Sequence, residues 1–177
     1  LAQLAPGVTN TLSPPGSITA FAGPNPPAGW LLCDGRAVSS VSYPWLYAAI
    51  STNWGGGFDW NGGTWVQGTN DFNLPDLRGV FLRGVTGTRS GSYSDPDSTS
   101  RGNAVQGGAS GNAVGSFQGD AFQEHQHPVN TYWDDSRGSH VRTSGGGGDN
   151  FPAATRLAGG SSETRPKNAY VNYIIKY

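Results

Sequence analysis

The stretch YVNYIIKY, residues Tyr170–Tyr177, is the part of the sequence that indicates the fold most clearly. It is rich in β-branched and aromatic residues, which predicts a strand. Such a strand is typical of an element buried between sheets or between subunits. We therefore expect it to lock the assembly late in folding.

Three shorter elements are predicted near the start of the chain. Residues Ser17–Ala22 alternate enough to form a strand, and Trp30–Gly35 form an apolar strand that ends in an Asp-Gly turn. Residues Ser42–Ile50 are the one convincing helix, because Pro44 suits a first helical turn and Leu46 lies four residues before Ile50. These elements predict a mainly β and irregular fold with one short helix.

Other parts of the chain lack a regular period. Residues 51–70 hold Trp54, Trp60 and Trp65 among glycine and asparagine, which favours an ordered surface loop over a core element. Residues 85–116 are rich in glycine, serine, asparagine and threonine, and we expect irregular chain there. Residues 1–13 are a lead-in rich in small residues and proline, so we interpret them as a linker.

The composition excludes several classes of protein. The chain has 28 glycines, 12 prolines, 6 tryptophans and no methionine, and 13% of its residues are charged. This suits a turn-dense extracellular or virion component better than a cytosolic enzyme. A net charge of −1 gives no reason to expect nucleic acid or an anionic membrane as a partner, since both need a basic surface. No apolar run approaches the roughly 20 residues of a membrane helix, so we expect no membrane insertion.

Two smaller expectations concern the single cysteine and the first residue. Cys33 has no cysteine partner within the chain, so it cannot form an intramolecular disulfide. We expect its side chain to be buried and to pack as a small hydrophobic group. The sequence begins at Leu1 rather than at a methionine, so we expect a fragment or a processed product.

Two of the three histidines, His125 and His127, form a His-X-His motif. In an extended chain they would project from one face, roughly 6.6 Å apart at about 3.3 Å per residue, so both imidazoles reach one metal. One chain then supplies two ligands, whereas three copies on a threefold axis would supply six. Six imidazoles give octahedral geometry, which suits iron(II), nickel or cobalt better than the tetrahedral geometry that zinc prefers. We expect iron(II) first and zinc second. The alternative is a pair of surface or packed histidines without metal.

Four stretches together resemble the phage tail collar domain. They are PGSITAFAG at residues 15–23, PAGWLLCDG at 27–35, YPWLY at 43–47 and FNLPDLRGVFLRG at 72–84. The remainder, with His125-Gln126-His127 and the ending from Arg165 to Tyr177, is similar to the receptor-binding tips of contractile-phage tail fibres.

The resemblance implies a division of the chain and an assembly. Residues 1–13 would lead in from a fibre shaft, 14–84 would form the collar-like domain, and 85–177 would form an interwoven receptor-binding tip. It also implies an intertwined homotrimer at the distal end of a fibre, with one metal ion per trimer held by His125 and His127 of each subunit. Within the collar-like motif, Asp76, Arg78 and Arg83 place opposite charges where adjacent chains could pair.

The polar, glycine-rich segment between His127 and Arg165 suggests projecting loops, where binding sites commonly lie. It contains the run Tyr132, Trp133, Asp134 and Asp135. Aromatic faces beside carboxylates suit sugars, because a pyranose offers C–H groups to a ring and hydroxyls to polar partners. We expect the receptor contact at these four residues. The alternatives are that Trp133 only anchors its loop, or that Trp54, Trp60 and Trp65 form the receptor patch.

The favoured function is an adhesin at the end of a virion tail fibre or an extracellular fibre, belonging to a phage, an injection system or a bacterium. It would attach to a cell-surface glycan, such as lipopolysaccharide, or to a surface protein. We do not expect an enzyme. Asp134, Asp135 and Glu163 could in principle act as a glycosidase pair, but adjacent side chains seldom flank one scissile bond, and nothing in the sequence sets the separation or burial of these carboxylates. A polysaccharide-degrading spike and a structural collar or assembly protein without receptor binding are the alternatives.

Overall fold

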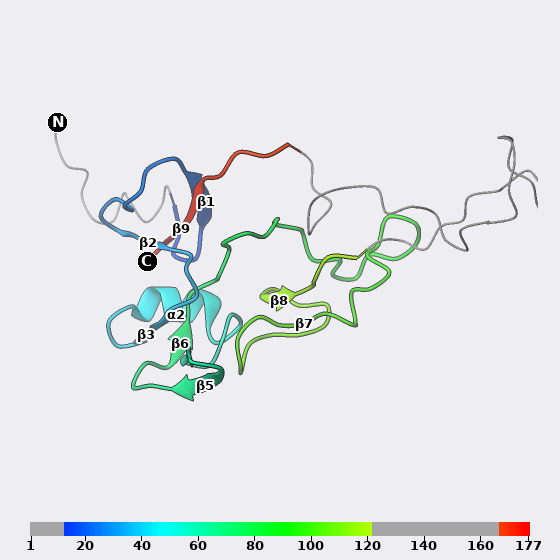
Figure 1. The fold of residues 1–177 in the computed structure, drawn as a ribbon. Coiled ribbons are helices and arrows are strands. Elements are labelled where there is room, and N and C mark those ends of the chain that lie inside the picture. Colours follow the sequence, from blue (N-terminus) through cyan, green and yellow to red (C-terminus); the bar gives the residue numbers. More distant parts are fainter. Residues whose placement is uncertain (1–12, 122–166) are drawn as a thin grey trace, which may run out of the picture. The chain divides into compact units, whose positions relative to one another are not determined.

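The computed structural model describes residues 13–121 and 167–177 (Figure 1). The chain divides into two compact units, residues 1–119 with 169–177, and residues 120–168. The described strands and helix all belong to the first unit. They are β1 (Ile18–Phe21), β2 (Trp30–Leu32), β3 (Ala37–Val38), α2 (Pro44–Ile50), β4 (Phe58–Asn61), β5 (Thr64–Gln67), β6 (Phe72–Asn73), β7 (Gly102–Asn103), β8 (Ser116–Phe117) and β9 (Asn172–Lys176).

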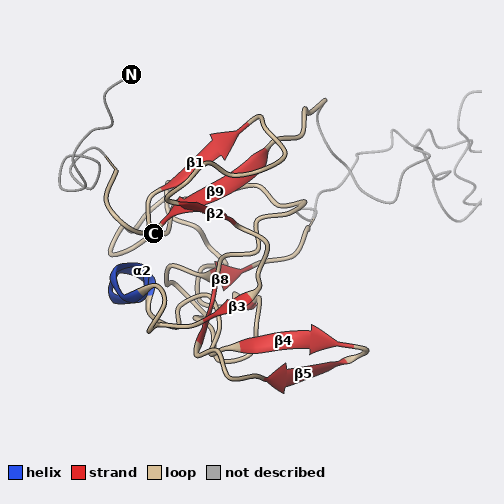
Figure 2. Cartoon of the chain, turned by 90° about the vertical axis from the view of Figure 1, so that its left-hand side faces the viewer, coloured by secondary structure: helices blue, strands red, loops and turns tan. Residues whose placement is uncertain are grey.

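The last strand, β9, is the centre of a three-stranded antiparallel sheet in the order β1-β9-β2 (Figure 2). Ile175 lies opposite Ile18 of β1 on one side and opposite Leu31 of β2 on the other. Ile175 is fully buried and Ile174 nearly so. The predicted strand is confirmed over Asn172–Lys176, and its burial is confirmed at Ile174 and Ile175, whereas Tyr170 and Val171 are exposed. Both neighbours of β9 come from the same chain. Residues far apart in the sequence are thereby joined in one sheet.

Helix α2 is confirmed, although it begins two residues later than expected. Pro44 occupies the first turn, where its missing N–H costs no intrahelical hydrogen bond. Leu46 and Ile50 are buried on the inner face, as their spacing of four residues predicts. They belong to one apolar core with Leu31, Cys33, Val38, Phe72, Leu74, Leu77 and Ile175.

The expectation of a surface loop over residues 51–70 is wrong for its second half. Strands β4 and β5 run side by side as an antiparallel hairpin (Figure 2), and Trp60 lies directly opposite Trp65. Gly62 and Gly63 form the two-residue turn with φ of 58° and 110°, a backbone that glycine adopts without strain. Trp54 lies before the hairpin and packs against the apolar core.

The segment that follows β6 is mostly irregular, as expected, and has a short ladder between β7 and β8. Its buried centre is Asp95, whose Oδ2 lies 3.7 Å from Arg83 Nη1 and 3.9 Å from Arg101 Nε. The backbone N–H of Ala109 donates to the carbonyl of Asn53, which attaches this segment to the loop after α2. Arg83, expected to pair between chains, thus has an acidic partner in its own chain.

Candidate functional site

The residues singled out as metal and receptor sites lie outside the part of the chain that the structure describes. They are His125, His127, Tyr132, Trp133, Asp134 and Asp135. Their roles therefore stay predictions. Of the alternative tryptophan patch, the structure brings Trp60 and Trp65 together and separates Trp54, which packs on the core.

Two aspartates and two arginines form a network of ion pairs where residues 34–36 lie beside residues 76–78. Asp34 and Asp76 pair as a single antiparallel β-bridge. Arg36 Nη1 donates to Asp34 Oδ2 at 3.1 Å, while Arg78 donates from Nε and Nη2 to both oxygens of Asp76 at 2.8 and 2.6 Å. The fork of Arg78 on Asp76 is the bidentate geometry of strong charge-assisted hydrogen bonds. These arginines pair within their own chain.

The bond from Arg78 holds the pKa of the Asp76 carboxyl below its ordinary value, mainly through the side-chain hydrogen bonds, against a smaller opposing effect of burial. The same contact raises the pKa of the Arg78 guanidinium. Both groups are therefore charged at neutral pH. Gly35 allows this arrangement, because its φ is 78° and an added Cβ would lie 2.9 Å from Cβ of Asp76.

The lowered pKa of Asp76 predicts an acid-dependent loss of stability. The unfolded carboxyl titrates near 3.8 and the folded one lower, so the pair stabilises the fold fully above that pH and is lost as the pH falls through the folded pKa. We expect Asp76→Asn to be less stable than the wild type at pH 7 and to approach it at an acidic pH well below 3.8. Urea unfolding at both pH values measures this, and an equal difference at both would contradict it.

A cleft of about 220 Å³ lies between this network and the β4–β5 hairpin. Its charged lining is Asp34, Arg36, Asp59, Asp76 and Arg78. Its aromatic and apolar lining is Trp60, Trp65 and Val105. The cleft thus combines indole rings, hydrogen-bond acceptors and hydrogen-bond donors around one space.

The hairpin is held against the cleft by buried polar contacts. Asn73 is fully buried, and its Oδ1 accepts from the backbone N–H groups of Gly57 and Phe58 at 2.9 and 3.0 Å. Its Nδ2 donates to the carbonyls of Gly35 and Phe58 at 2.9 and 2.7 Å. Asp59 Oδ1 accepts from the backbone N–H of Ala37 at 3.1 Å. Asn73 therefore ties the hairpin to the turn that carries Asp34 and Arg36.

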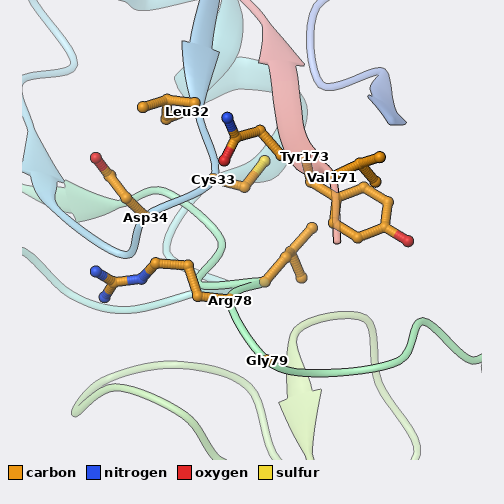
Figure 3. A pocket seen from close by; sticks show the side chains of 9 residues that line it. Leu32, Cys33, Asp34, Arg78, Gly79, Val171 and Tyr173 are labelled. Atoms are coloured by element: carbon orange, nitrogen blue, oxygen red, sulfur yellow. The ribbon is translucent and has the colours of Figure 1, made fainter. Parts of the chain in front are cut away.

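A second, smaller cavity of about 90 Å³ lies beside Cys33. Figure 3 shows Asp34 and the guanidinium of Arg78 on one side of it and Val171 and Tyr173 on the other. Burial, with the nearby charges of Asp34 and Asp76, raises the pKa of the Cys33 thiol to about 12. Such a thiol is neutral at physiological pH and unsuited to nucleophilic attack. The expected burial of Cys33 as a small hydrophobic side chain is confirmed.

The described residues contain neither a group of metal-ligating side chains nor a membrane-spanning helix. Within 13–121 and 167–177, no three histidine, cysteine, aspartate or glutamate side chains are grouped so that they could hold a metal ion. The three carboxylates that line the cleft share it with two arginine side chains. Over the same residues, no helix has the length and apolarity needed to cross a membrane.

Sequence reasoning missed the cleft and named only part of its lining. Trp60 and Trp65 were noted, but Asp59 and the two Asp–Arg pairs were not connected with them. The signal for the hairpin was present in Asn61-Gly62-Gly63-Thr64, since a Gly-Gly pair between two short runs favours a two-residue turn. Nothing local indicates that Val105 lies there.

Comparison with known proteins agrees with the resemblance drawn from the motifs. Residues 16–82 match the family model of the Phage Tail Collar Domain. Protein RhiB of Rhizobium leguminosarum bv. viciae is 36% identical over 164 residues, which cover 84% of this chain and 64% of RhiB. Protein StfE of Escherichia coli strain K12 is 28% identical over 179 residues, which cover 85% of this chain and 80% of StfE. The chain thus spans less than two thirds of the length of RhiB.

Proposed function

We propose that this chain, which carries a phage tail collar domain over residues 16–82, is a receptor-binding adhesin at the distal end of a trimeric tail fibre. The collar domain indicates a component of a phage tail or fibre, which is a structural role rather than a catalytic one. The observation that carries the proposal is this domain, followed by a long glycine-rich segment whose composition suits exposed loops. The receptor would be a cell-surface glycan, such as lipopolysaccharide, or a surface protein.

Exposed apolar side chains support a homotrimer. Phe81 is 74% exposed and Tyr170 is 84% exposed, although both are large and hydrophobic. Leu82, Val85 and Val171 are exposed beside them in the sequence. Soluble monomers rarely expose many such side chains together, and contact with further copies of the chain would remove them from water.

The metal belongs to the same proposal. His125 and His127 of three subunits would hold one ion, iron(II) first and zinc second, because six imidazole nitrogens suit octahedral coordination. The ion would join three chains at one point. Its role would be to stabilise the assembly and not to take part in a reaction.

Receptor contact is proposed at Tyr132, Trp133, Asp134 and Asp135. We expect Trp133→Ala and Tyr132→Ala each to lower the affinity for receptor-bearing cells by at least about tenfold, because buried aromatic anchors dominate most binding interfaces. Flow cytometry with the labelled protein measures the affinity. Tyr93→Ala is a matched control, since Tyr93 is 80% exposed and lies outside this run.

Three outcomes would change the proposal. If both variants and the wild type bind cells equally well, the receptor contact lies elsewhere. If a folded trimer binds no cells, the chain acts as a structural collar or assembly protein. Release of oligosaccharides from purified surface polysaccharide would instead identify a degrading tail spike.

A further inference from the structure

We propose that the cleft beside the β4–β5 hairpin binds one neutral sugar ring of a surface glycan. This inference rests on the proposed function, because it assigns a glycan contact to an adhesin. It names a site separate from the run Tyr132–Asp135, built from residues that the structure describes.

The aromatic side of the cleft is a pair of tryptophans. The rings of Trp60 and Trp65 lie 5.0 Å apart at 70° to each other, so one indole presents its edge to the face of the other. Trp60 nevertheless remains 62% exposed. Packing between the two rings therefore leaves much of its surface in water, beside a cavity. An indole face of this kind accepts the C–H groups of a pyranose.

The polar side of the cleft offers both donors and acceptors. Arg36 uses Nη1 and Arg78 uses Nε and Nη2 for their carboxylate partners, although a guanidinium has five N–H donors. In the described part of the chain, the other donors of both arginines have no hydrogen-bond partner. Asp59 uses Oδ1 for the backbone of Ala37, and its Oδ2 accepts no hydrogen bond within residues 13–121 and 167–177. Sugar hydroxyls, which both donate and accept, match this mixture.

The lining is held in place before any ligand binds. The buried side chain of Asn73 fixes the start of β4 to the turn at Gly35 through hydrogen bonds, and Asp59 fixes β4 to β3. The two ion pairs hold both arginines against their acids. A cleft arranged in this way loses little conformational entropy on binding, which favours affinity for a small ligand.

Size and charge define the ligand class. A cleft of about 220 Å³ is smaller than the roughly 300–1,000 Å³ of sites for drug-sized ligands, so it suits one ring rather than a long chain. Three aspartates and two arginines line it, which leaves one net negative charge. Each arginine is already paired with a carboxylate, so neither is an open anion site. A neutral hexopyranose therefore fits better than a uronic or sialic acid.

The experiment uses the full chain and single-ring probes. Methyl glycosides of glucose, galactose, mannose and N-acetylglucosamine, with glucuronic acid as the anionic comparison, are tested by saturation-transfer NMR and calorimetry. We expect a neutral glycoside to bind, and Trp60→Ala to weaken it at least about tenfold. Trp60→Phe keeps an aromatic face and should restore part of the affinity. Trp45→Ala is the matched control, because Trp45 is 71% exposed on α2 and does not line the cleft.

The outcomes separate this inference from the proposed function. Unchanged glycoside binding in a folded Trp60→Ala variant overturns the inference, as does preference for glucuronic acid. Cell binding without binding of any neutral glycoside overturns the inference and leaves the adhesin intact. Loss of glycoside binding in Trp133→Ala but not in Trp60→Ala moves the sugar site to the run Tyr132–Asp135. If a folded chain binds neither cells nor glycosides, both proposals fail.

Discussion

Asn73→Ala is expected to lower the free energy of unfolding by at least about 3 kcal/mol, because a buried group left without its hydrogen bond costs about 1–3 kcal/mol. The side chain of Asn73 is fully buried and pairs with two backbone N–H groups and two backbone carbonyls. Alanine has neither the acceptor nor the donor, so all four contacts would be lost. Urea unfolding at one fixed chain concentration measures the change.

The matched control is Asn70→Ala. Asn70 is half-buried, and its Nδ2 donates one hydrogen bond to the carbonyl of Ala37 at 3.0 Å. Its replacement should cost about 1 kcal/mol, the net value of one ordinary hydrogen bond. If Asn73→Ala costs no more than Asn70→Ala, the hairpin is held by something other than Asn73.

The double variant His125→Ala, His127→Ala is expected to abolish metal binding and to lower the melting temperature of the trimer. The wild type should carry about one ion per three chains, and the variant none, because imidazole nitrogens are the proposed ligands. An ion that binds only the folded assembly stabilises it, so its loss lowers the apparent stability. Elemental analysis with calorimetry, together with chelation of the wild type, measures both effects.

His140 offers a control of the same residue type. It lies outside the His-X-His motif, so His140→Ala should keep the metal and the melting temperature of the wild type. A stable trimer without metal in any preparation would contradict the metal proposal and leave His125 and His127 as ordinary polar residues. Equal metal loss in His140→Ala would enlarge the proposed ligand set.

The elements with a strong local pattern could be predicted from the sequence. Tyr170–Tyr177 indicated a buried strand through its β-branched and aromatic residues, and Pro44 with Leu46 and Ile50 indicated the helix. The partners of β9 could not be predicted, because strand composition does not specify which edges will pair. The β4–β5 hairpin was not predicted because adjacent Trp65 and Val66 break the alternation in β5, although β4 alternates and Gly62-Gly63 marks the turn.

The cleft was harder to predict from the sequence than the fold. Asp34, Trp60 and Asp76 come from three separate segments, and their meeting depends on the buried amide of Asn73. An asparagine in a short motif gives no sign that it will be fully buried. Conversely, the motif His125-Gln126-His127 is plain in the sequence but lies beyond the described residues, so its interpretation rests on its chemistry and on the collar resemblance.

The most direct test of the account is whether the purified chain attaches to cells. Labelled protein is titrated onto a panel of bacteria, with an excess of unlabelled protein as competitor. We expect saturable, competable binding to particular strains, lost when the surface glycan or surface protein that acts as receptor is removed. A folded chain that shows no saturable binding to any strain, including the host of the fibre, would contradict the adhesin.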